Sequence, residues 1–394
     1  MKIVVVASLA YSLVNFRGRL LAAMIAMGHS VLACAPDEDP ETERQLQMMG
    51  VSYHRLPMER TGTNPFDDAR TLAWLVGFLR REKPDVVLAY TQKPIVYAGA
   101  ASRLAGQGRF YAMVSGLGHV FSDGGSPLGA PLRRAVSVLY RYALGRARAV
   151  FVFNGDDEGE MVRRGILRRD AVVVQVPGSG IDLSRYAQHP VPAGPPTFLL
   201  VARLLRNKGH FEFAEAARIV RARHPEVRFR LLGPPDPGEM GVDMATIAAW
   251  QAEGVIEYLG ETRDVRPYLA AATVVVLPSW YREGLPRTLL EAMATGRAVI
   301  TTDMPGCREP VIPGETGYLV PARDAEALAA AMIRFVDQPA LAVTMGAAGR
   351  KLAEQHFAVE RVNDILLRTM DLRADPPSSG FSAPIPRMIA GGAV

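Results

Sequence analysis

The stretch Met1–Ala35, MKIVVVASLAYSLVNFRGRLLAAMIAMGHSVLACA, indicates the fold class of the whole chain. Its run Ile3–Ala7 is apolar and β-branched, which is typical of a strand buried on both faces. Arg17–Met27 has apolar residues at helical spacing and stops at Gly28, a residue that commonly ends helices. A second apolar strand follows at Ser30–Ala35. A strand, a helix and a second strand in this order form the unit of a parallel sheet.

The same alternation continues along the chain and is interrupted once, at His189–Pro196, whose sequence HPVPAGPP predicts a linker. Before it we expect strands at Asp85–Ala89, Phe110–Val114 and Ala149–Phe153, with helices at Asp67–Arg81 and Leu132–Leu144. After it we expect strands at Thr197–Val201, Val227–Leu232, Ile256–Leu259, Val274–Leu277 and Ala298–Thr302, with helices at Gly209–Arg223, Leu289–Thr295 and Asp324–Asp337. This pattern predicts an α/β protein with two Rossmann-like, doubly wound parallel sheets.

Two such domains facing each other would form a cleft, and ligands of these sheets bind at the carboxyl ends of the strands. We expect a first domain over residues 1–180 and a second over residues 181–373, with a linker at about 177–196. This division allows the last helix to pack back on the first domain. The tail 374–394 is rich in Pro, Gly and Ser and is predicted to be disordered.

Composition narrows the class of protein further. The 394 residues are 49% hydrophobic and 22% charged, which is typical of a globular chain. Cys34 and Cys307 are the two cysteines, too few for a disulfide framework, and favour a reduced, cytoplasmic protein. No uncharged apolar run reaches the roughly 18 residues of a membrane span. Residues 1–180 carry a net charge of +6 and the remainder −1, which suggests an anionic partner for the first half.

Several common nucleotide and metal motifs are missing from the sequence. The loop Ser8–Arg17 lacks the G-x-G-x-x-G of dinucleotide-binding folds, and Gly116-Leu117-Gly118 supplies two of its three glycines. There is no P-loop, no Cys/His cluster of zinc spacing and no G-x-S-x-G elbow. These absences weigh against nicotinamide or flavin enzymes, P-loop enzymes, zinc enzymes and α/β-hydrolases.

Two glutamates stand out in the segment 282–296, REGLPRTLLEAMATG. Glu283 precedes Gly284 and Pro286, which break regular structure, and Glu291 lies within the helix that follows. Backbone N–H groups at such a helix start can hold phosphate, and the carboxylates can accept hydrogen bonds from sugar and ribose hydroxyls. The alternative is that both are solvated acids near a helix end.

Two cations follow the first strand of the second half, in Ala202–Gly209, ARLLRNKG. Arg203 and Lys208 would lie at the carboxyl end of that strand. Cations at this place can stabilise the negative charge of a departing diphosphate. Considered by itself, this motif is equally consistent with two ordinary surface cations.

Together these motifs resemble those of the retaining glycosyltransferases of family 4, which have the GT-B architecture of two Rossmann-like domains. The resemblance extends to about residue 373. It implies that Arg203 and Lys208 stabilise the leaving diphosphate, that Glu283 orients the donor sugar and that Glu291 binds the ribose. It also places Gly284, Leu285 and Gly260 in the donor site, Gly260 near the nucleobase.

Three further segments are similar to the bacterial subgroup that builds capsules, O-antigens and lipid-linked glycans: NFRG (15–18), SGLGHVF (115–121) and the hinge motif PGSGIDLSRY (177–186). The subgroup includes N-acetylhexosaminyltransferases with UDP donors. The resemblance therefore implies a metal-independent hexosyltransferase with no cofactor, a UDP-sugar donor in the second domain and a lipid-diphosphate-linked or saccharide acceptor in the first. A nucleotide-sugar epimerase or phosphorylase of the same architecture, or a non-catalytic binding subunit, are the alternatives.

The chain also departs from the family pattern. Tyr11-Ser12-Leu13 stands where many members have a glycine pair, and Ser115 stands near the place of a common histidine. His119 is a candidate contact of the donor sugar or else a loop histidine. Arg17 is the better candidate in the first domain, as a cation at the mouth of the cleft. Asp37–Asp39 has an Asp-x-Asp form but falls on a polar loop, so we predict no metal site.

The basic segment 132–148 raises the question of a membrane. Leu132, Val136, Leu139 and Ala143 form one helical stripe, and arginines 134, 141 and 148 lie near another face. Such a helix could rest on an anionic membrane, or it could be an ordinary helix packed on the sheet with a solvated basic face. No aromatic residues alternate with the arginines, which weighs against nucleic acid. We expect a cytoplasmic protein, peripheral on the inner face of the cytoplasmic membrane if this helix makes the contact.

Overall fold

The structure is a computed structural model that describes residues 1–59, 64–117 and 129–373. The strands of the first domain are β1 (Lys2–Val6), β2 (Ser30–Ala35), β3 (Ser52–Arg55), β4 (Val86–Tyr90), β5 (Arg109–Val114), β6 (Ala149–Val152) and β7 (Val173–Gln175). Its helices are α1 (Ala10–Asn15), α2 (Gly18–Ala26), α3 (Pro40–Met48), α4 (Pro65–Glu82), α5 (Gln92–Ala105), α6 (Gly129–Leu144) and α7 (Gly155–Arg163).

The second domain contains strands β8 (Thr197–Val201), β9 (Arg228–Leu232), β10 (Glu257–Tyr258), β11 (Val274–Leu277), β12 (Ala298–Thr302) and β13 (Gly317–Val320). Its helices are the short turn η2 (Arg206–Lys208), α8 (His210–Arg221), α9 (Met244–Ala252), α10 (Arg266–Ala270), α11 (Arg287–Ala294), α12 (Ala325–Asp337) and α13 (Ala340–Leu352). The chain ends with the π-helical turn η3 (Ala353–Phe357) and α14 (Val359–Thr369).

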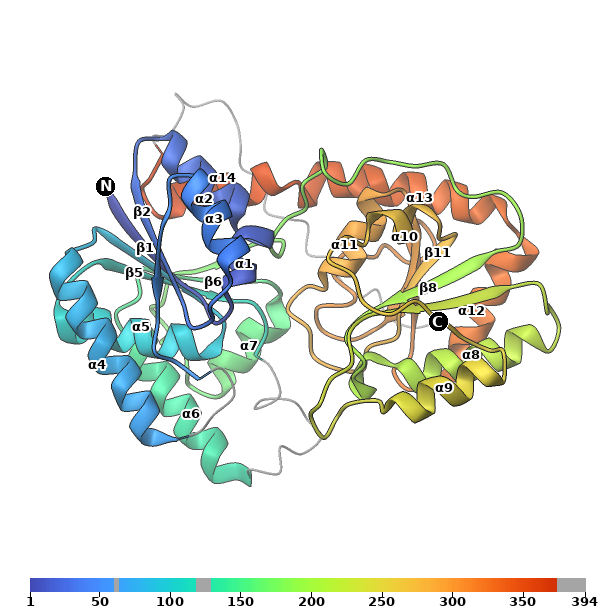
Figure 1. Cartoon of the computed structure of the whole chain (residues 1–394), viewed down its shortest axis with the longest axis horizontal. Coiled ribbons are helices and arrows are strands. Elements are labelled where there is room, and N and C mark those ends of the chain that lie inside the picture. The colour runs from blue at the N-terminus through green and yellow to red at the C-terminus, as the bar shows by residue number, and fades with distance from the viewer. Residues whose placement is uncertain (60–63, 118–128, 374–394) are drawn as a thin grey trace.

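Each domain is built around one parallel sheet, and Figure 1 shows the two sheets side by side with helices on both faces. The first sheet has the strand order β3-β2-β1-β4-β5-β6-β7 and the second β10-β9-β8-β11-β12-β13. In both sheets the order reverses next to the first strand, between β1 and β4 and between β8 and β11. The predicted fold class, two doubly wound parallel-sheet domains, is confirmed.

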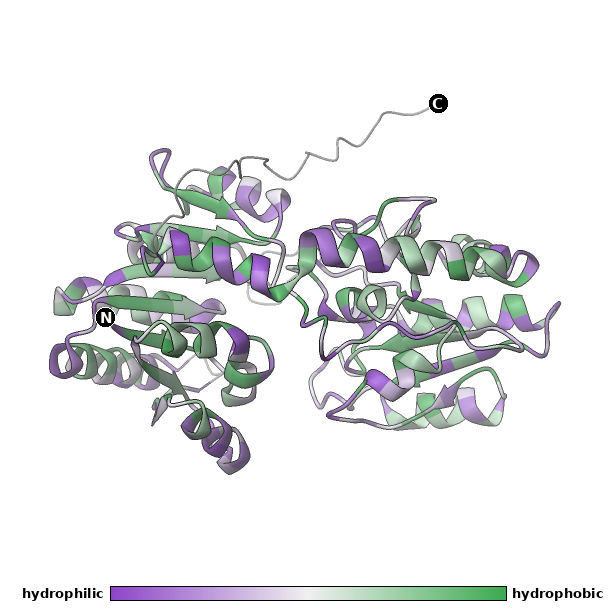
Figure 2. Cartoon of the chain, turned by 90° about the horizontal axis from the view of Figure 1, so that it is seen from above, coloured by the Kyte–Doolittle hydropathy of each residue, from purple (hydrophilic) through white to green (hydrophobic). Residues whose placement is uncertain are grey.

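Strand β1 shows why an uninterrupted apolar run forms the centre of such a sheet. Ile3 and Val5 pack in the cluster that includes residues of α2 and α14. Val4 and Val6, which point to the other face, pack in the cluster that includes residues of α4 and α5. Both faces are covered, so every residue of the run has to be apolar. Figure 2 shows hydrophobic residues along the strands of both sheets.

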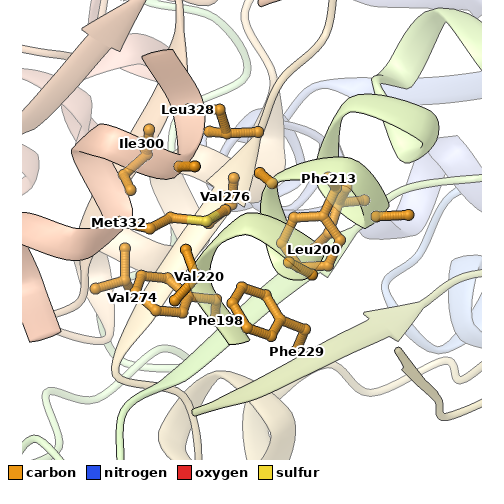
Figure 3. Packing of buried hydrophobic residues seen from close by; sticks show 14 of the residues in the cluster. Phe198, Leu200, Phe213, Val220, Phe229, Val274, Val276, Ile300, Leu328 and Met332 are labelled. Atoms are coloured by element: carbon orange, nitrogen blue, oxygen red, sulfur yellow. The ribbon is translucent and has the colours of Figure 1, made fainter. Parts of the chain in front are cut away.

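The second domain has an equivalent core, shown in Figure 3. Phe198 of β8 and Phe229 of β9 stack with ring centroids 5.4 Å apart, and Phe213 of α8 meets Phe229 edge to face at 5.8 Å. Burying a side chain of this size contributes roughly 1.5–3 kcal/mol. Such cores make each sheet a rigid platform for the loops at its strand ends.

The last helix crosses back to the first domain. Two backbone hydrogen bonds join the chain segments that pass between the domains: Ile181 N donates to Phe357 O, and Val359 N donates to Ile181 O. Val362 and Leu366 of α14 are fully buried in the cluster beneath β1 and α2. The first domain's core is therefore completed by the carboxyl-terminal end of the described chain.

One segment that the sequence analysis assigned to a loop contains a helix. The segment Ser8–Arg17, expected to be a loop, contains α1. The first N–H of this helix, that of Ala10, donates a hydrogen bond at 2.8 Å to the carboxylate of Asp37, which lies in the loop after β2. Ala10 and Leu13 are buried, so tertiary packing holds a helix that is too short to form alone.

Within the described residues, no single helix has the length and apolar character of a membrane span. The pair Ala325–Asp337 and Ala340–Phe357 meets that criterion only jointly, across a bend of 105°.

Candidate active site

The carboxyl edges of the two sheets meet at a close backbone contact. Ser115 and Gly116 follow β5, and Gly284 follows β11. A Cβ added to Gly284 would lie 2.1 Å from the carbonyl oxygen of Ser115, and one added to Gly116 would lie 2.9 Å from the nitrogen of Gly284. Gly116 also has a φ of +119°. Both positions therefore require glycine, and they bring the Glu283 loop against the first domain.

Asn154, directly after β6, ties this contact together. Its Nδ2 donates to the carbonyl oxygen of Gly284 at 2.8 Å and to that of Glu283 at 3.3 Å. Its Oδ1 accepts from the N–H of Asp157 at 2.7 Å and so caps α7. Sequence reasoning missed this residue, although an Asn between a strand and a helix is a recognisable cap signal.

A charged pair lies beside Asn154. Arg282 Nη2 is 3.4 Å from Asp157 Oδ1, and the Asp157 side chain is fully buried. Burial raises the pKa of Asp157 to about 6, although Arg282 and Asn154 act in the opposite direction. Nearby, Arg308 joins Asp156 at 3.0 Å. The loop that carries Glu283 is therefore held by ionic contacts as well as by the amide of Asn154.

Lys208 and Glu283 form an ion pair, with the side chains 19% and 13% exposed. Lys208 is in η2 after β8, and Glu283 is in the loop after β11. Glu283 Oε1 also accepts a hydrogen bond from Ser279 Oγ at 3.0 Å. Gly209 permits the close approach of η2, because its φ is +81° and a Cβ there would lie 2.1 Å from Pro278 O. The structure thus brings together two residues that sequence analysis placed in separate motifs.

Arg203 lies on the same strand end but is more open. Its side chain is 58% exposed and pairs with Asp236 at 2.9 Å. Beneath it, the buried ring of His210 lies with Nε2 2.8 Å from the carbonyl oxygen of Arg203. Burial lowers the pKa of His210 to about 4, so the ring is neutral near pH 7. A neutral His210 adds no positive charge to that of Lys208 and Arg203 at this strand end.

Glu291 projects from α11 and is 7% exposed. Its Oε1 accepts hydrogen bonds from the hydroxyl of Tyr186 and from Nε of Arg287, both at 2.8 Å. Tyr186 is the last residue of the hinge motif, so that segment supplies a direct contact to a candidate site residue. Leu285 packs against Gly178 of the same motif, where an added Cβ would lie 2.8 Å from Leu285 Cδ2.

Gly260 follows β10 with a φ of +76°, and its carbonyl accepts from the N–H of Gly233 at 2.8 Å. A Cβ at Gly260 would meet nothing within 4 Å, so the space beside it is open. Gly233 is different, because its Cβ would lie 1.8 Å from Ala202 O. Gly233 was not singled out from sequence, since one glycine after a strand carries little signal.

Arg17 lies at the reversal of strand order in the first sheet, but inside the protein, with 3% exposure. Its guanidinium is 5.2 Å from the ring centroid of Tyr90 and 5.9 Å from that of Phe153. Its Nε is buried with no hydrogen-bond partner among the described residues. Burial lowers the pKa of Arg17 to about 10. The sequence placed this cation at the cleft mouth, whereas the structure buries it between two aromatic rings.

Other sequence candidates lie elsewhere. His119 is outside the described residues. Asp39 caps α3 by accepting from the N–H of Thr42 at 3.1 Å, which explains half of the Asp-x-Asp form as a helix start. In the described ranges no group of three or more His, Cys, Asp or Glu side chains is placed to hold a metal ion.

Glu309 was missed by sequence analysis. Burial raises the pKa of its carboxyl to about 7, and its Oε2 has no hydrogen-bond partner among the described residues. Its loop touches that of Glu283, since Glu283 N donates to Pro305 O at 3.0 Å and a Cβ on Gly306 would lie 2.3 Å from Glu283 O. Glu309 is therefore a titratable group one loop behind the candidate site.

Comparison with known proteins covers both domains. Residues 195–338 match the family described as glycosyl transferases group 1, and residues 15–177 match the glycosyl transferase 4-like domain. The chain is 25% identical over 330 residues to the N,N'-diacetylbacillosaminyl-diphospho-undecaprenol alpha-1,3-N-acetylgalactosaminyltransferase of Campylobacter jejuni, covering 80% of this chain and 84% of that one.

One further relative and one solved structure are similar over most of the chain. The chain is 25% identical over 320 residues to the UDP-Gal:alpha-D-GlcNAc-diphosphoundecaprenol alpha-1,3-galactosyltransferase of Escherichia coli, covering 76% and 78% of the two chains. The crystal structure of Anabaena Alr3699/HepE in complex with UDP superposes with a TM-score of 0.75 at 19% identity, covering 94% of this chain and all of that one. The latter likeness concerns the fold.

Proposed function

Because this chain belongs to the glycosyltransferases that combine a glycosyl transferase 4-like domain with a group 1 domain, we propose that it is a retaining hexosyltransferase. It moves a sugar, an N-acetylhexosamine or hexose, from a UDP-sugar to a lipid-diphosphate-linked or saccharide acceptor. The two relatives named above act on sugars linked to diphospho-undecaprenol, which supports the acceptor class. The UDP in the HepE complex supports the donor class.

The observation that carries this proposal is the Lys208–Glu283 ion pair, at the point where the first domain contacts the Glu283 loop. An ammonium here can stabilise charge that develops on a departing diphosphate, while the carboxylate accepts hydrogen bonds from donor hydroxyls. Arg203 adds a second cation at the same strand end. Glu291, on the helix behind, supplies a carboxylate for the ribose. No metal and no cofactor enter this scheme.

The proposed step balances with the substrates' own groups. The acceptor hydroxyl oxygen forms a bond to the anomeric carbon on the face from which the diphosphate leaves. The bond between that carbon and the phosphate oxygen breaks, and the acceptor's proton passes to the leaving phosphate. Lys208 and Arg203 stabilise the negative charge as it develops. The face of attack gives retention of the anomeric configuration.

Nucleotide binding is the first test. Thermal unfolding should be measured with UDP, GDP, ADP and NAD for the wild type, Glu291→Gln and the matched control Glu315→Gln, an exposed glutamate in the same domain. A ligand at 100 times its Kd stabilises the folded state by about 2.7 kcal/mol. We expect a UDP-selective increase in Tm that is lost in Glu291→Gln and kept in Glu315→Gln. A response to NAD alone would contradict the proposal.

Turnover is the second test. Replacing Lys208 or Glu283 by Ala should reduce kcat by about 100-fold, the effect expected for a group that stabilises transition-state charge. The Tm of each variant should stay close to that of the wild type. NMR of the product's anomeric proton reports the stereochemistry. Near-normal turnover in either variant, or an inverted product, would contradict the assigned role.

The membrane contact, which the sequence left open against an ordinary packed helix, is proposed with a different face of α6. Val136 and Ala143 of the predicted apolar stripe pack toward the protein, whereas Leu139 of that stripe points outward. The outward face of α6 carries Val138, Leu139 and Tyr142, whose side chains are 57%, 50% and 40% exposed. With the basic residues of the same helix they support a peripheral position on the inner face of the cytoplasmic membrane.

A further inference from the structure

A cavity of about 370 Å³ opens at the amino ends of β4 and β5, where four arginines surround it. They come from the last turn of α5 (Arg103), the start of β5 (Arg109) and the segment between α6 and β6 (Arg146 and Arg148). Because the strands are parallel, this edge of the sheet is opposite the edge that carries the candidate active site. The cavity is therefore a separate feature.

The charge of the cavity is only partly balanced. Arg109 donates to Asp371 at 2.7 Å, and the carboxylate of Asp85, which also lines the cavity, accepts from the N–H of Lys2 at 2.7 Å. Among the described residues no carboxylate pairs with Arg103, Arg146 or Arg148. A concave surface lined by charges of one sign focuses its field and concentrates counter-ions. The cavity is thus suited to an anion.

Exposed apolar side chains lie near Arg103, one of the arginines that line the cavity. The Arg103 guanidinium lies 4.4 Å from the ring centroid of Tyr142 on α6. Val138 is one turn earlier on the same face, and Leu104, next to Arg103, is 49% exposed. A site for a soluble anion has no need of exposed apolar neighbours. Arginines beside exposed apolar side chains are instead what a lipid headgroup region accommodates.

We propose that this cavity binds the phosphate of an anionic phospholipid, with the outward face of α6 resting at headgroup level. The proposal rests on the proposed function, because it gives the enzyme a bilayer that holds its acceptor. As the crossover from β5 to β6, helix α6 runs from the active-site edge of the sheet to the cavity. A lipid bound at the end of α6 would therefore align the membrane along the helix toward the active site.

Vesicle sedimentation of the full chain tests this directly. Vesicles of phosphatidylcholine alone and with phosphatidylglycerol are compared for the wild type and for the triple variant Arg103→Gln, Arg146→Gln and Arg148→Gln. Each near-surface cation is worth about fivefold in affinity, equivalent to about 1 kcal/mol, so the triple variant should lose roughly 100-fold.

The matched control replaces Arg223, Arg228 and Arg263, three exposed arginines of the second domain, by Gln. It removes the same charge and should keep wild-type binding to phosphatidylglycerol vesicles.

Equal losses in the two triple variants would show that only net charge matters and would overturn the proposal, as would unchanged binding of the cavity variant. Stabilisation of the wild type by inorganic phosphate, without vesicle binding, would assign the cavity to a soluble anion and also overturn it. The Val138→Ser, Leu139→Ser double variant should bind vesicles more weakly at unchanged Tm. Since the vesicles contain no acceptor, these outcomes are independent of whether the protein transfers a sugar.

Discussion

The side-chain amide of Asn154 in the first domain donates a hydrogen bond to the carbonyl oxygen of Gly284 in the second, 2.8 Å away and 130 residues later in the chain. The same amide reaches the carbonyl of Glu283. The backbone of the proposed donor-binding loop is therefore positioned by the domain expected to hold the acceptor. In this arrangement the relative position of the domains and the position of Glu283 depend on each other.

Asn154 should act as a positioning residue. Asn154→Ser keeps an oxygen that can cap α7 but is too short to donate to Gly284, so kcat should fall about tenfold while Tm and UDP affinity hold. Asn154→Ala loses both roles and should also lower the free energy of unfolding by about 1 kcal/mol. Steady-state kinetics and thermal unfolding separate the two effects. A Ser variant with wild-type kcat would show that the amide contact has no part in turnover.

Gly284 should tolerate no side chain. Gly284→Ala places a methyl group 2.1 Å from Ser115 O, so the loop or the domains must move apart. We expect at least a tenfold fall in kcat and a larger radius of gyration by solution scattering with UDP bound. The control is Gly77→Ala in α4, where a Cβ meets nothing within 4 Å and should add about 0.5–1 kcal/mol of stability. Full activity in Gly284→Ala would refute the interface described here.

We expect Arg17 to lower the free energy of unfolding and to increase turnover. A buried cation without a carboxylate partner opposes folding, so Arg17→Met should leave the free energy of unfolding unchanged or raise it by about 1 kcal/mol. Turnover should fall at least tenfold if the cation meets a substrate phosphate.

Arg297 provides the contrast for Arg17. It is fully buried and donates to the carbonyls of Leu269, Pro190 and Ala270. Arg297→Met should therefore destabilise by about 3 kcal/mol, because buried carbonyls lose their donors. If Arg17→Met destabilises to the same degree, Arg17 is a structural residue like Arg297. Urea unfolding of the two variants makes the comparison.

His210 should make the protein less stable in acid. Its pKa is lowered from 6.5 to about 4 in the fold by burial and by Lys208. The unfolded chain binds the proton more tightly, so His210's contribution is fully present above about pH 6.5 and is lost as pH falls through 4. The full loss is about 3 kcal/mol. The free energy of unfolding, measured with urea between pH 7 and 4, should fall less steeply with falling pH in His210→Gln than in the wild type. The control His189→Gln, which changes an exposed linker residue, should keep the wild-type dependence on pH.

The sequence alone was enough to predict two parallel sheets and the alternation of strands and helices along the chain. An uninterrupted run such as Ile3–Val6 is stable only where both faces are covered, so it indicates a doubly wound parallel sheet without any knowledge of its partners. The sequence also singled out Lys208, Glu283 and Glu291 as candidate residues of a donor site, because each lies within a few residues of a predicted strand or helix end. Signals of that kind involve residues that are close together in the sequence, so they can be recognised without knowledge of the fold.

The tertiary structure alone decided which side chains meet. Asn154 finds Gly284 at a separation of 130 residues, and Tyr186 finds Glu291 at a separation of 105. Periodicity and spacing carry no information over such distances, since the contacts arise only when two sheets and a returning α14 have fixed the domains against each other. The burial of Arg17 has the same origin. Its environment is made by strands β4 and β6, which pack beside it only because of the strand order that the folded sheet adopts.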